Sequence, residues 1–256
     1  MLDGEVVVIT GVGAGLGAKL ASRAVEEGAK VVMAARSTNV TELVEKETDG
    51  AAVAVQCDVR KEEDCARVVE TAVERFGTVT GLVNSAYAHP GFFDLLETPE
   101  KGLRRSMDVI LHGSLNMTRL VVPHMKAAGR GSIVNVGTMT TRKPMRGEGG
   151  YAVAKAAMTS ATQFLALELG EHGIRCNQAI MGWLDGPGVR FYLTMTAEQK
   201  GISERDVYDD IASRNPLGRI PTDEACAGAV LFLLSRYASE VTGATLDVNG
   251  GEYMPP

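Results

Sequence analysis

A tyrosine and a lysine four residues apart are the side chains in this sequence with the clearest potential for chemistry. They are Tyr151 and Lys155 in the stretch "GTMTTRKPMRGEGGYAVAK", and Thr138 lies thirteen residues before the tyrosine. If "YAVAK" is helical, as the alanine-rich run after it indicates, the two side chains share one face and the ammonium group can approach the phenol. Such a pair is also typical of a solvated helix face, so the surrounding elements must decide between a proton donor and ordinary polar surface.

Composition limits the kinds of protein that this sequence can encode. Its 256 residues with 45% hydrophobic content are enough to bury one sizeable core, so we expect a single domain. A net charge of −6 argues against a nucleic-acid partner, whose phosphates would need a basic surface. No apolar run is long enough to cross a bilayer, and the start "MLDGEVVVITG" lacks the pattern of a signal peptide. We therefore expect a cytoplasmic protein that binds neither nucleic acid nor membrane.

Cysteine and histidine spacing predicts no metal site. The four histidines are scattered along the chain, and the four cysteines show no C-x-x-C spacing. We expect the cysteines to be small core residues.

Short β-branched runs alternate with longer stretches of helical period along most of the chain. The strand candidates are residues 5–10, 30–35, 51–57, 81–86, 131–137, 174–180 and 244–250. Helical segments separate nearly all of them, which is the order of βαβ units. Near-continuous apolar runs such as "VVV" fit strands that are buried on both faces. The pattern predicts an α/β protein with a parallel sheet covered by helices on both sides.

Residues 182–215 lack strong periodicity, and we expect a long loop there. A loop of this length in a compact domain is usually a lid or a binding segment. Aromatic side chains gather in it and after the fourth strand, and two interpretations stay open: they line a binding site, or they fill the core under loops. These aromatic residues are Tyr87, Phe92, Phe93, Trp183, Phe191 and Tyr192.

A glycine-rich turn, "TGVGAGLG", joins the first predicted strand to the first predicted helix. Its glycines Gly11, Gly15 and Gly17 have the spacing G-x-x-x-G-x-G. Glycines at such a turn let backbone N–H groups approach a phosphate at the positive end of the helix. The turn therefore predicts nucleotide binding.

Taken together, these motifs resemble those of the short-chain dehydrogenase/reductase family over essentially the whole chain. The quoted markers, in order, are "TGVGAGLG", "CDV", "LVNSA", the spacing of Thr138, Tyr151 and Lys155, "IRCNQAIMG", "NPLGRIPTDE" and "VTGATLDVNGG". The resemblance implies a Rossmann-type, doubly wound, seven-stranded parallel sheet in one domain spanning residues 1–256. From the missing periodicity noted above, we place a substrate lid at about 182–215 in this domain. It also implies a nicotinamide cofactor, a reversible carbonyl/alcohol reaction and a homotetramer or homodimer.

The same resemblance gives the opening residues a catalytic role. Protonation of the alkoxide that forms when a carbonyl accepts hydride needs an acid, and Tyr151 matches the family's acid/base. Lys155 matches the lysine that holds the nicotinamide ribose, and we expect its ammonium group to lower the pKa of the phenol. Thr138 stands where most relatives have a serine that hydrogen-bonds the substrate oxygen.

Cofactor choice can be argued from the end of the second predicted strand. An acidic residue there would bind the ribose 2′-hydroxyl of NAD, but this chain has Ala35 followed by Arg36, whose guanidinium suits a 2′-phosphate. We therefore expect NADP(H) to be favoured over NAD(H). The resemblance assigns cofactor contacts to Gly11, Gly13, Gly15, Leu16, Gly17, Arg36, Asp58, Val59, Asn84, Ala86, Tyr151, Lys155 and Gly182.

Five positions depart from the family pattern. Tyr87 replaces a glycine, Met181 a proline, Gly186 a threonine that bonds the nicotinamide amide, and Asn249 an aspartate. Ile110 replaces the asparagine that in most relatives completes the catalytic set. In those relatives the helix is locally opened at this position.

The asparagine's main-chain carbonyl in those relatives holds a water that passes protons from the lysine. A main-chain carbonyl exists whatever the side chain. We therefore expect a water to bridge Lys155 to a carbonyl at or beside Ile110.

The sequence thus predicts an NADP(H)-dependent oxidoreductase that interconverts a ketone and a secondary alcohol. The aromatic residues favour a fairly apolar or ring-bearing substrate. One alternative is a 3-oxoacyl thioester reductase. Another is a non-catalytic nucleotide-binding protein that retains the fold, and the departure at Ile110 motivates it.

Overall fold

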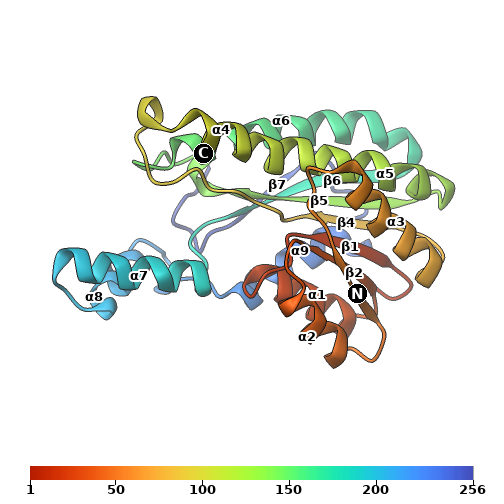
Figure 1. Cartoon of the computed structure of the whole chain (residues 1–256), viewed down its shortest axis with the longest axis horizontal. Helices are drawn as coiled ribbons and strands as arrows, with labels where there is room; N and C mark the ends of the chain where they lie inside the picture. The colour runs from red at the N-terminus through yellow and green to blue at the C-terminus, as the bar shows by residue number, and fades with distance from the viewer. Residues whose placement is uncertain (256) are drawn as a thin grey trace.

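A seven-stranded parallel sheet lies between two layers of helices in the computed structural model, which describes residues 1–255 (Figure 1). The strand order is β3-β2-β1-β4-β5-β6-β7, and every neighbouring pair is parallel. The predicted single-domain, doubly wound α/β fold is confirmed. The strands are β1 (Val6–Thr10), β2 (Lys30–Ala35), β3 (Ala52–Gln56), β4 (Gly81–Asn84), β5 (Gly131–Thr138), β6 (Ile174–Met181) and β7 (Thr245–Val248).

Helices cover both faces of the sheet, as Figure 1 shows. One layer holds α1 (Leu16–Glu26), α2 (Asn39–Glu47) and α9 (Asp223–Leu234), and the other holds α3 (Glu62–Phe76), α4 (Glu100–Met107), α5 (Gly113–Ala127) and α6 (Gly149–Leu169). A large hydrophobic cluster fills the space on each side of the sheet. Strand β1 reads Val-Val-Val-Ile-Thr and is buried at all five positions, because side chains on both of its faces meet helices.

The segment expected to be a long loop, residues 182–215, contains two helices. They are α7 (Pro187–Lys200) and α8 (Glu204–Ala212), which lie beside each other away from the sheet (Figure 1). The expected loop was therefore wrong, and local signals explain the helices. Pro187 occupies the first turn of α7, and Ser203 and Asp206 form a capping box at the start of α8. The apolar period is weak because the pair buries only a small hydrophobic cluster of its own.

Several shorter features complete the described part of the chain. A π-helical turn, η2 (Asp108–His112), joins α4 to α5. All four cysteines are free and buried, as expected of small core residues. No helix within residues 1–255 combines the length and the apolar character needed to cross a membrane. Single 3₁₀ turns span Leu95–Glu97, Met139–Thr141, Gly170–His172 and Arg236–Ala238.

A chain of buried polar side chains links two central strands to α6. Asn84 on β4 donates from Nδ2 to Oδ1 of Asn135 on β5 at 2.9 Å. Asn135 donates in turn from Nδ2 to the hydroxyl of Thr162 on α6 at 2.9 Å. All three side chains are buried. Since α6 also carries Tyr151 and Lys155, this chain helps to fix the helix against the carboxyl end of the sheet.

Replacing Asn135 with leucine should destabilise the fold. The change leaves the amide of Asn84 buried without its partner, and burial of an unsatisfied polar group costs about 1–3 kcal/mol. We expect the free energy of unfolding in urea to fall by about 2–4 kcal/mol, since packing is disturbed as well. Gln163→Ala, an exposed change on α6, is the control and should stay within about 0.5 kcal/mol. Equal stability of the two variants would contradict a role for the buried chain.

Candidate active site

A cavity of about 460 Å³ lies at the carboxyl ends of the central strands, where open α/β sheets bind their ligands. It brings together the glycine turn after β1, the end of β5, the start of α6 and the segment after β6. Of the residues predicted from the sequence, those that line the cavity are Gly11, Gly13, Gly15, Leu16, Gly17, Thr138, Tyr151, Lys155 and Gly182. The topology therefore unites the glycine turn with the tyrosine and lysine that suggested chemistry.

Five predicted cofactor residues do not line this cavity. They are Arg36, Asp58, Val59, Asn84 and Ala86. Asn84 is buried, and its Nδ2 donates to Asn135 while its Oδ1 has no partner within residues 1–255. Ala86 contributes backbone that closely approaches Gly11.

The glycine turn is built around two close backbone approaches. Gly11 has a φ of +73°, and a Cβ there would lie 2.5 Å from the Cα of Ala86. A Cβ on Gly17 would lie 2.7 Å from the Cα of Val12, so this glycine lets α1 pack closely against the turn. The first helix starts after Gly15, which has no side chain to cap it. The uncapped N–H groups at the start of α1 can therefore receive a phosphate, and the turn fits a dinucleotide.

Tyr151 lies in the first turn of α6, and its surroundings favour the protonated form of its phenol. Burial raises the pKa of the phenol well above its usual value, and the nearby charge of Glu148 raises it further. The phenol therefore keeps its proton at neutral pH. This state suits protonation of an alkoxide.

Lys155 follows one turn later and is 2% exposed. Its Nζ donates to the main-chain carbonyl of Val136 at 2.5 Å and lies 5.7 Å from the ring centroid of Tyr151. Burial lowers the pKa of this ammonium group to about 8. The expectation that Lys155 lowers the pKa of Tyr151 was wrong for this structure. Burial disfavours both charged forms, and the ammonium group bonds a carbonyl instead of the phenol.

Thr138 ends β5 and presents its hydroxyl to the cavity. The hydroxyl oxygen accepts a bond from the main-chain N–H of Thr140 at 3.4 Å and lies 3.2 Å from the Thr140 hydroxyl. A hydroxyl has one proton to donate, and the Thr140 hydroxyl can serve as donor or acceptor. Thr138 can therefore direct its proton toward a ligand oxygen in the cavity.

The helix is locally opened at Ile110, which lies in the π-helical turn between α4 and α5. The side chain is fully buried against Ala154 and Met158 of α6. Its carbonyl accepts a hydrogen bond from the hydroxyl of Ser114 at 2.7 Å. A carbonyl oxygen has two lone pairs and can accept more than one hydrogen bond.

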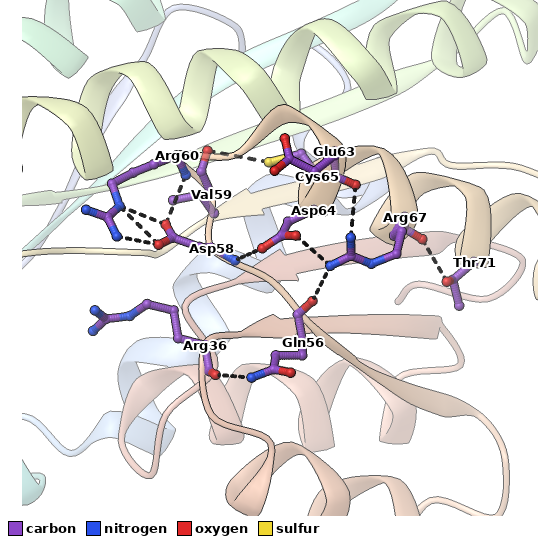
Figure 2. Close-up of polar contacts among 10 residues, drawn as sticks. All are labelled: Arg36, Gln56, Asp58, Val59, Arg60, Glu63, Asp64, Cys65, Arg67 and Thr71. Atoms are coloured by element: carbon purple, nitrogen blue, oxygen red, sulfur yellow. Dashed lines mark hydrogen bonds and ion pairs between the residues drawn. The ribbon is translucent and has the colours of Figure 1, made fainter.

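The predicted adenosine end of the site lies at the carboxyl ends of β2 and β3 (Figure 2). Asp58 is bound there by Arg60, whose Nε lies 2.9 Å from Oδ1, and this bond is the main reason that the pKa of Asp58 falls to about 2. The assignment of Asp58 to the cofactor stays a prediction, because a carboxylate whose two oxygens bond Arg60 still has lone pairs that can accept a bond from an adenine amino group. Figure 2 shows the Arg36 guanidinium extended beside this pair without a hydrogen bond to any residue drawn.

Asp223 is a cavity residue that the sequence did not indicate. It is 8% exposed and lines the cavity, and its carboxylate makes no hydrogen bond or ion pair within residues 1–255. Its Oδ2 lies 2.0 Å from the point that a Cβ on Gly186 would occupy. Asp223 therefore fills the space left by the absent side chain at 186. Burial raises the pKa of its carboxyl group, and the charge of Asp185 adds to this effect.

Other cavity residues also come from segments far apart in the sequence. His89 follows β4 and Glu148 precedes Tyr151, and both line the cavity. Of the six aromatic residues noted in the sequence, only Tyr87 and Trp183 line it, while Phe92, Phe93, Phe191 and Tyr192 do not. No cluster of three or more metal-binding side chains occurs in the described part of the chain.

Comparisons with known proteins agree on one family of enzymes. A family model described as enoyl-(acyl carrier protein) reductase matches residues 11–252. L-fucose dehydrogenase of Oryctolagus cuniculus is 34% identical over 248 residues, which cover 97% of this chain and 84% of that protein. L-rhamnose 1-dehydrogenase (NAD(P)(+)) of a Sphingomonas species is 32% identical over 259 residues, covering 99% and 98%. The crystal structure of a short-chain dehydrogenase/reductase, a glucose/ribitol dehydrogenase from Brucella melitensis, superposes with a TM-score of 0.88 at 25% identity, covering 99% and 98%.

Replacing Lys155 with methionine should stabilise the fold at neutral pH. The unfolded chain keeps this lysine protonated up to about 10.5, whereas the folded chain releases the proton near 8. The contribution of Lys155 to the free energy of unfolding is therefore most unfavourable below pH 8, and it improves between pH 8 and 10.5. We expect Lys155→Met to raise the free energy of unfolding by about 1–3 kcal/mol at pH 7, after allowance for the lost bond to Val136. The gain should shrink at pH 10.

Urea denaturation at the two pH values measures this effect. Lys126→Met, an exposed change on α5, is the matched control and should show no pH-dependent gain. A loss of stability in Lys155→Met at pH 7 would mean that the bond to Val136 outweighs the burial of charge.

Proposed function

Because the chain belongs to the short-chain dehydrogenase/reductase family and is thus an NAD(P)-dependent oxidoreductase, we propose that it uses NADP(H) to interconvert a ketone and a secondary alcohol. The observation that carries this proposal is a partly buried, protonated Tyr151 in the same cavity as the glycine turn. A proton donor beside a dinucleotide site is what carbonyl reduction requires.

The proposed reaction divides the work between cofactor and protein. The nicotinamide, when bound, supplies the hydride to the carbonyl carbon or accepts it from the alcohol. Tyr151 gives its proton to the oxygen in reduction and takes a proton from the hydroxyl in oxidation. Thr138 donates a hydrogen bond to the same oxygen as its negative charge develops. Lys155 holds the cofactor ribose and passes protons onward.

The proposed proton path uses a position at which this chain differs from most of its relatives. We place Ile110 where they have an asparagine, and Thr138 where they have a serine. The main-chain carbonyl of Ile110 accepts a bond from Ser114, and a carbonyl oxygen can accept more than one hydrogen bond. A water on this carbonyl would link it to Lys155.

The proposed cofactor contacts follow the shape of the cavity. Backbone N–H groups at Gly15, Leu16 and Gly17 face the pyrophosphate at the positive end of α1. Arg36 lies beyond the cavity with its guanidinium extended, in keeping with a 2′-phosphate contact (Figure 2). This arrangement supports NADP(H) over NAD(H).

The proposed substrate is ring-bearing and has one apolar face. Tyr87 and Trp183 line the cavity and can pack against such a face. A second candidate is the oxidation of a sugar lactol to a lactone, which the names of the L-fucose and L-rhamnose dehydrogenases suggest. Two polar side chains in the cavity, His89 and Glu148, favour it. A 3-oxoacyl thioester reductase remains an alternative with no matching feature in the cavity.

Two further proposals concern the surroundings of the site. Residues 182–215 act as the substrate lid, since Trp183 and Val189 line the cavity and pack against the α7–α8 cluster. The chain assembles into a homotetramer or homodimer, in keeping with the exposed apolar residues Phe164 and Leu167 on α6. The expected cytoplasmic location stays a prediction.

Tyr151→Phe should remove most turnover while keeping the fold. The variant loses only the hydroxyl, and a positioned acid contributes about 10²–10⁴ in rate. Steady-state rates with NADPH and a panel of cyclic ketones measure the loss, and circular dichroism checks the fold. Turnover within a few-fold of the native rate would exclude Tyr151 as the essential acid.

Arg36→Ala should weaken NADPH binding about tenfold or more and leave NADH binding nearly unchanged. The reason is that only NADPH carries the phosphate that a charge-assisted hydrogen bond would reach. Fluorescence titration of both nucleotides gives the two dissociation constants. Arg75→Ala, on the exposed side of α3, is the control. Equal affinity of the native protein for NADH and NADPH would contradict the proposed preference.

Ile110→Asn should change turnover by no more than about tenfold, or roughly 1.4 kcal/mol of barrier. The relay carbonyl belongs to the main chain, so the side chain contributes little. The two proteins are compared on one ketone panel with NADPH. A silent native protein beside an active variant would support the non-catalytic alternative instead.

A further inference from the structure

A histidine and a glutamate form a hydrogen-bonded pair on the wall of the cavity beside Tyr151. His89 Nε2 lies 3.2 Å from Oε2 of Glu148. Their side chains are 23% and 16% exposed, and both residues line the cavity. Neither side chain has a task in the proton transfer described above.

The surroundings of His89 fix where its proton lies. The main-chain N–H of Gly91 donates to Nδ1 at 3.1 Å, so Nδ1 must be unprotonated. The proton of the neutral ring is therefore on Nε2, which donates to Glu148. The pair has one acidic member and one neutral member, and its net charge is −1.

The imidazole is also held between two aromatic rings. Its centroid lies 4.6 Å from that of Phe92 and 5.2 Å from that of Tyr151. Tilted contacts of this kind are favourable for aromatic pairs. The ring therefore has little freedom to turn away from Glu148.

Glu148 has one oxygen to spare for a ligand. Oε2 accepts from His89, whereas Oε1 receives no hydrogen bond from any residue in 1–255. The residue sits at the N-cap of α6, but its side chain does not cap the helix.

The free oxygen lies within reach of the reacting centre. Glu148 precedes Tyr151 by three residues, so both side chains emerge from the same face of the first turn of α6. The Glu148 charge is close enough to contribute to the raised pKa of Tyr151. A substrate whose reacting oxygen bonds Tyr151 therefore brings its neighbouring groups to Glu148.

We propose that Glu148, positioned by His89, is the specificity-determining acceptor for a hydroxyl group next to the reacting carbon of a polyhydroxylated ring substrate. A carboxylate oxygen accepts hydroxyl protons strongly. An apolar substrate such as a steroid would desolvate Glu148 without giving it a partner. An acidic substrate would meet like charge, which excludes 2-oxo acids on electrostatic grounds.

This inference rests on the proposed oxidoreductase function and deepens it to one substrate class. It selects neutral sugars in their cyclic form over the purely apolar ketones that the sequence favoured. The apolar face of the sugar ring still meets Tyr87 and Trp183 on the cavity wall.

The test compares ring substrates with and without neighbouring hydroxyl groups. Native protein is assayed in the oxidative direction with NADP⁺, using a panel of aldoses that includes L-fucose and L-rhamnose. The parallel substrate is tetrahydropyran-2-ol, a lactol ring that lacks the other hydroxyl groups. Each oxidation converts a lactol to a lactone and reduces one NADP⁺, so absorbance reports all of them.

Glu148→Gln should lower kcat/KM for the best aldose about tenfold or more, mainly through KM, because a hydrogen bond to a charged acceptor is lost. Its kcat/KM for tetrahydropyran-2-ol should fall much less, because this ring offers Glu148 no neighbouring hydroxyl group. Glu168→Gln, an exposed change on the same helix, is the control and should alter neither value.

His89 is tested as a positioning residue by its effect on the same preference. His89→Ala should reduce the ratio of aldose to tetrahydropyran-2-ol activity. His89→Gln should restore part of it, since the glutamine amide can donate to Glu148. Equal loss on both substrates in all variants would mean that the pair acts only through Tyr151 and would overturn the inference.

Failure of the inference differs from failure of the proposed function. If the native protein oxidises tetrahydropyran-2-ol as well as any aldose, the function stands and the hydroxyl acceptor is overturned. If it neither oxidises these lactols with NADP⁺ nor reduces cyclic ketones with NADPH, the proposed function and the hydroxyl acceptor are both overturned. A strong aldose preference that Glu148→Gln abolishes supports both.

Discussion

The burial of one ammonium group is the constraint on which the active centre depends. Lys155 is almost fully enclosed, and its main partner is the carbonyl of Val136. A buried cation of this kind costs the fold free energy at neutral pH, as its pKa of about 8 indicates. The two hydrophobic clusters on either side of the sheet must offset that cost. The same burial keeps the phenol of Tyr151 protonated, so one environment prepares both groups.

Close contact between backbones gives the cavity its shape. Gly11 approaches Ala86 and Gly182 approaches Asn249 at distances that no side chain at either glycine would allow. These contacts draw the ends of neighbouring strands together, and they leave the space above the strands open. The position of Asp223 follows the same logic, since its carboxylate occupies room that Gly186 leaves free. The absence of a side chain at Gly186 thus decides where the Asp223 carboxylate lies in this cavity.

The sequence predicted correctly those features that depend on residues close together along the chain. Apolar runs predicted the seven strands, and the glycine turn and the Tyr151–Lys155 spacing located one end of the cavity and its proton donor. The misses have a common cause in contacts between distant segments. The His89–Glu148 pair joins the loop after β4 to the start of α6. The raised pKa of Tyr151 depends on burial, which spacing along the chain does not reveal. Helices α7 and α8 were missed because so few of their side chains are buried.

The small separate core of α7 and α8 has a consequence for evolution. Leu193, Val207 and Ile211 pack with one another, apart from the two clusters that hold the sheet. Substitutions there reshape the cavity wall near Trp183 with little energetic coupling to the sheet, because distant sites act almost independently. A duplicated gene could therefore acquire a new substrate by changing this helical pair alone. The sheet can then stay unchanged while the cavity wall near Trp183 varies, and enzymes for different substrates can arise without passing through unfolded intermediates.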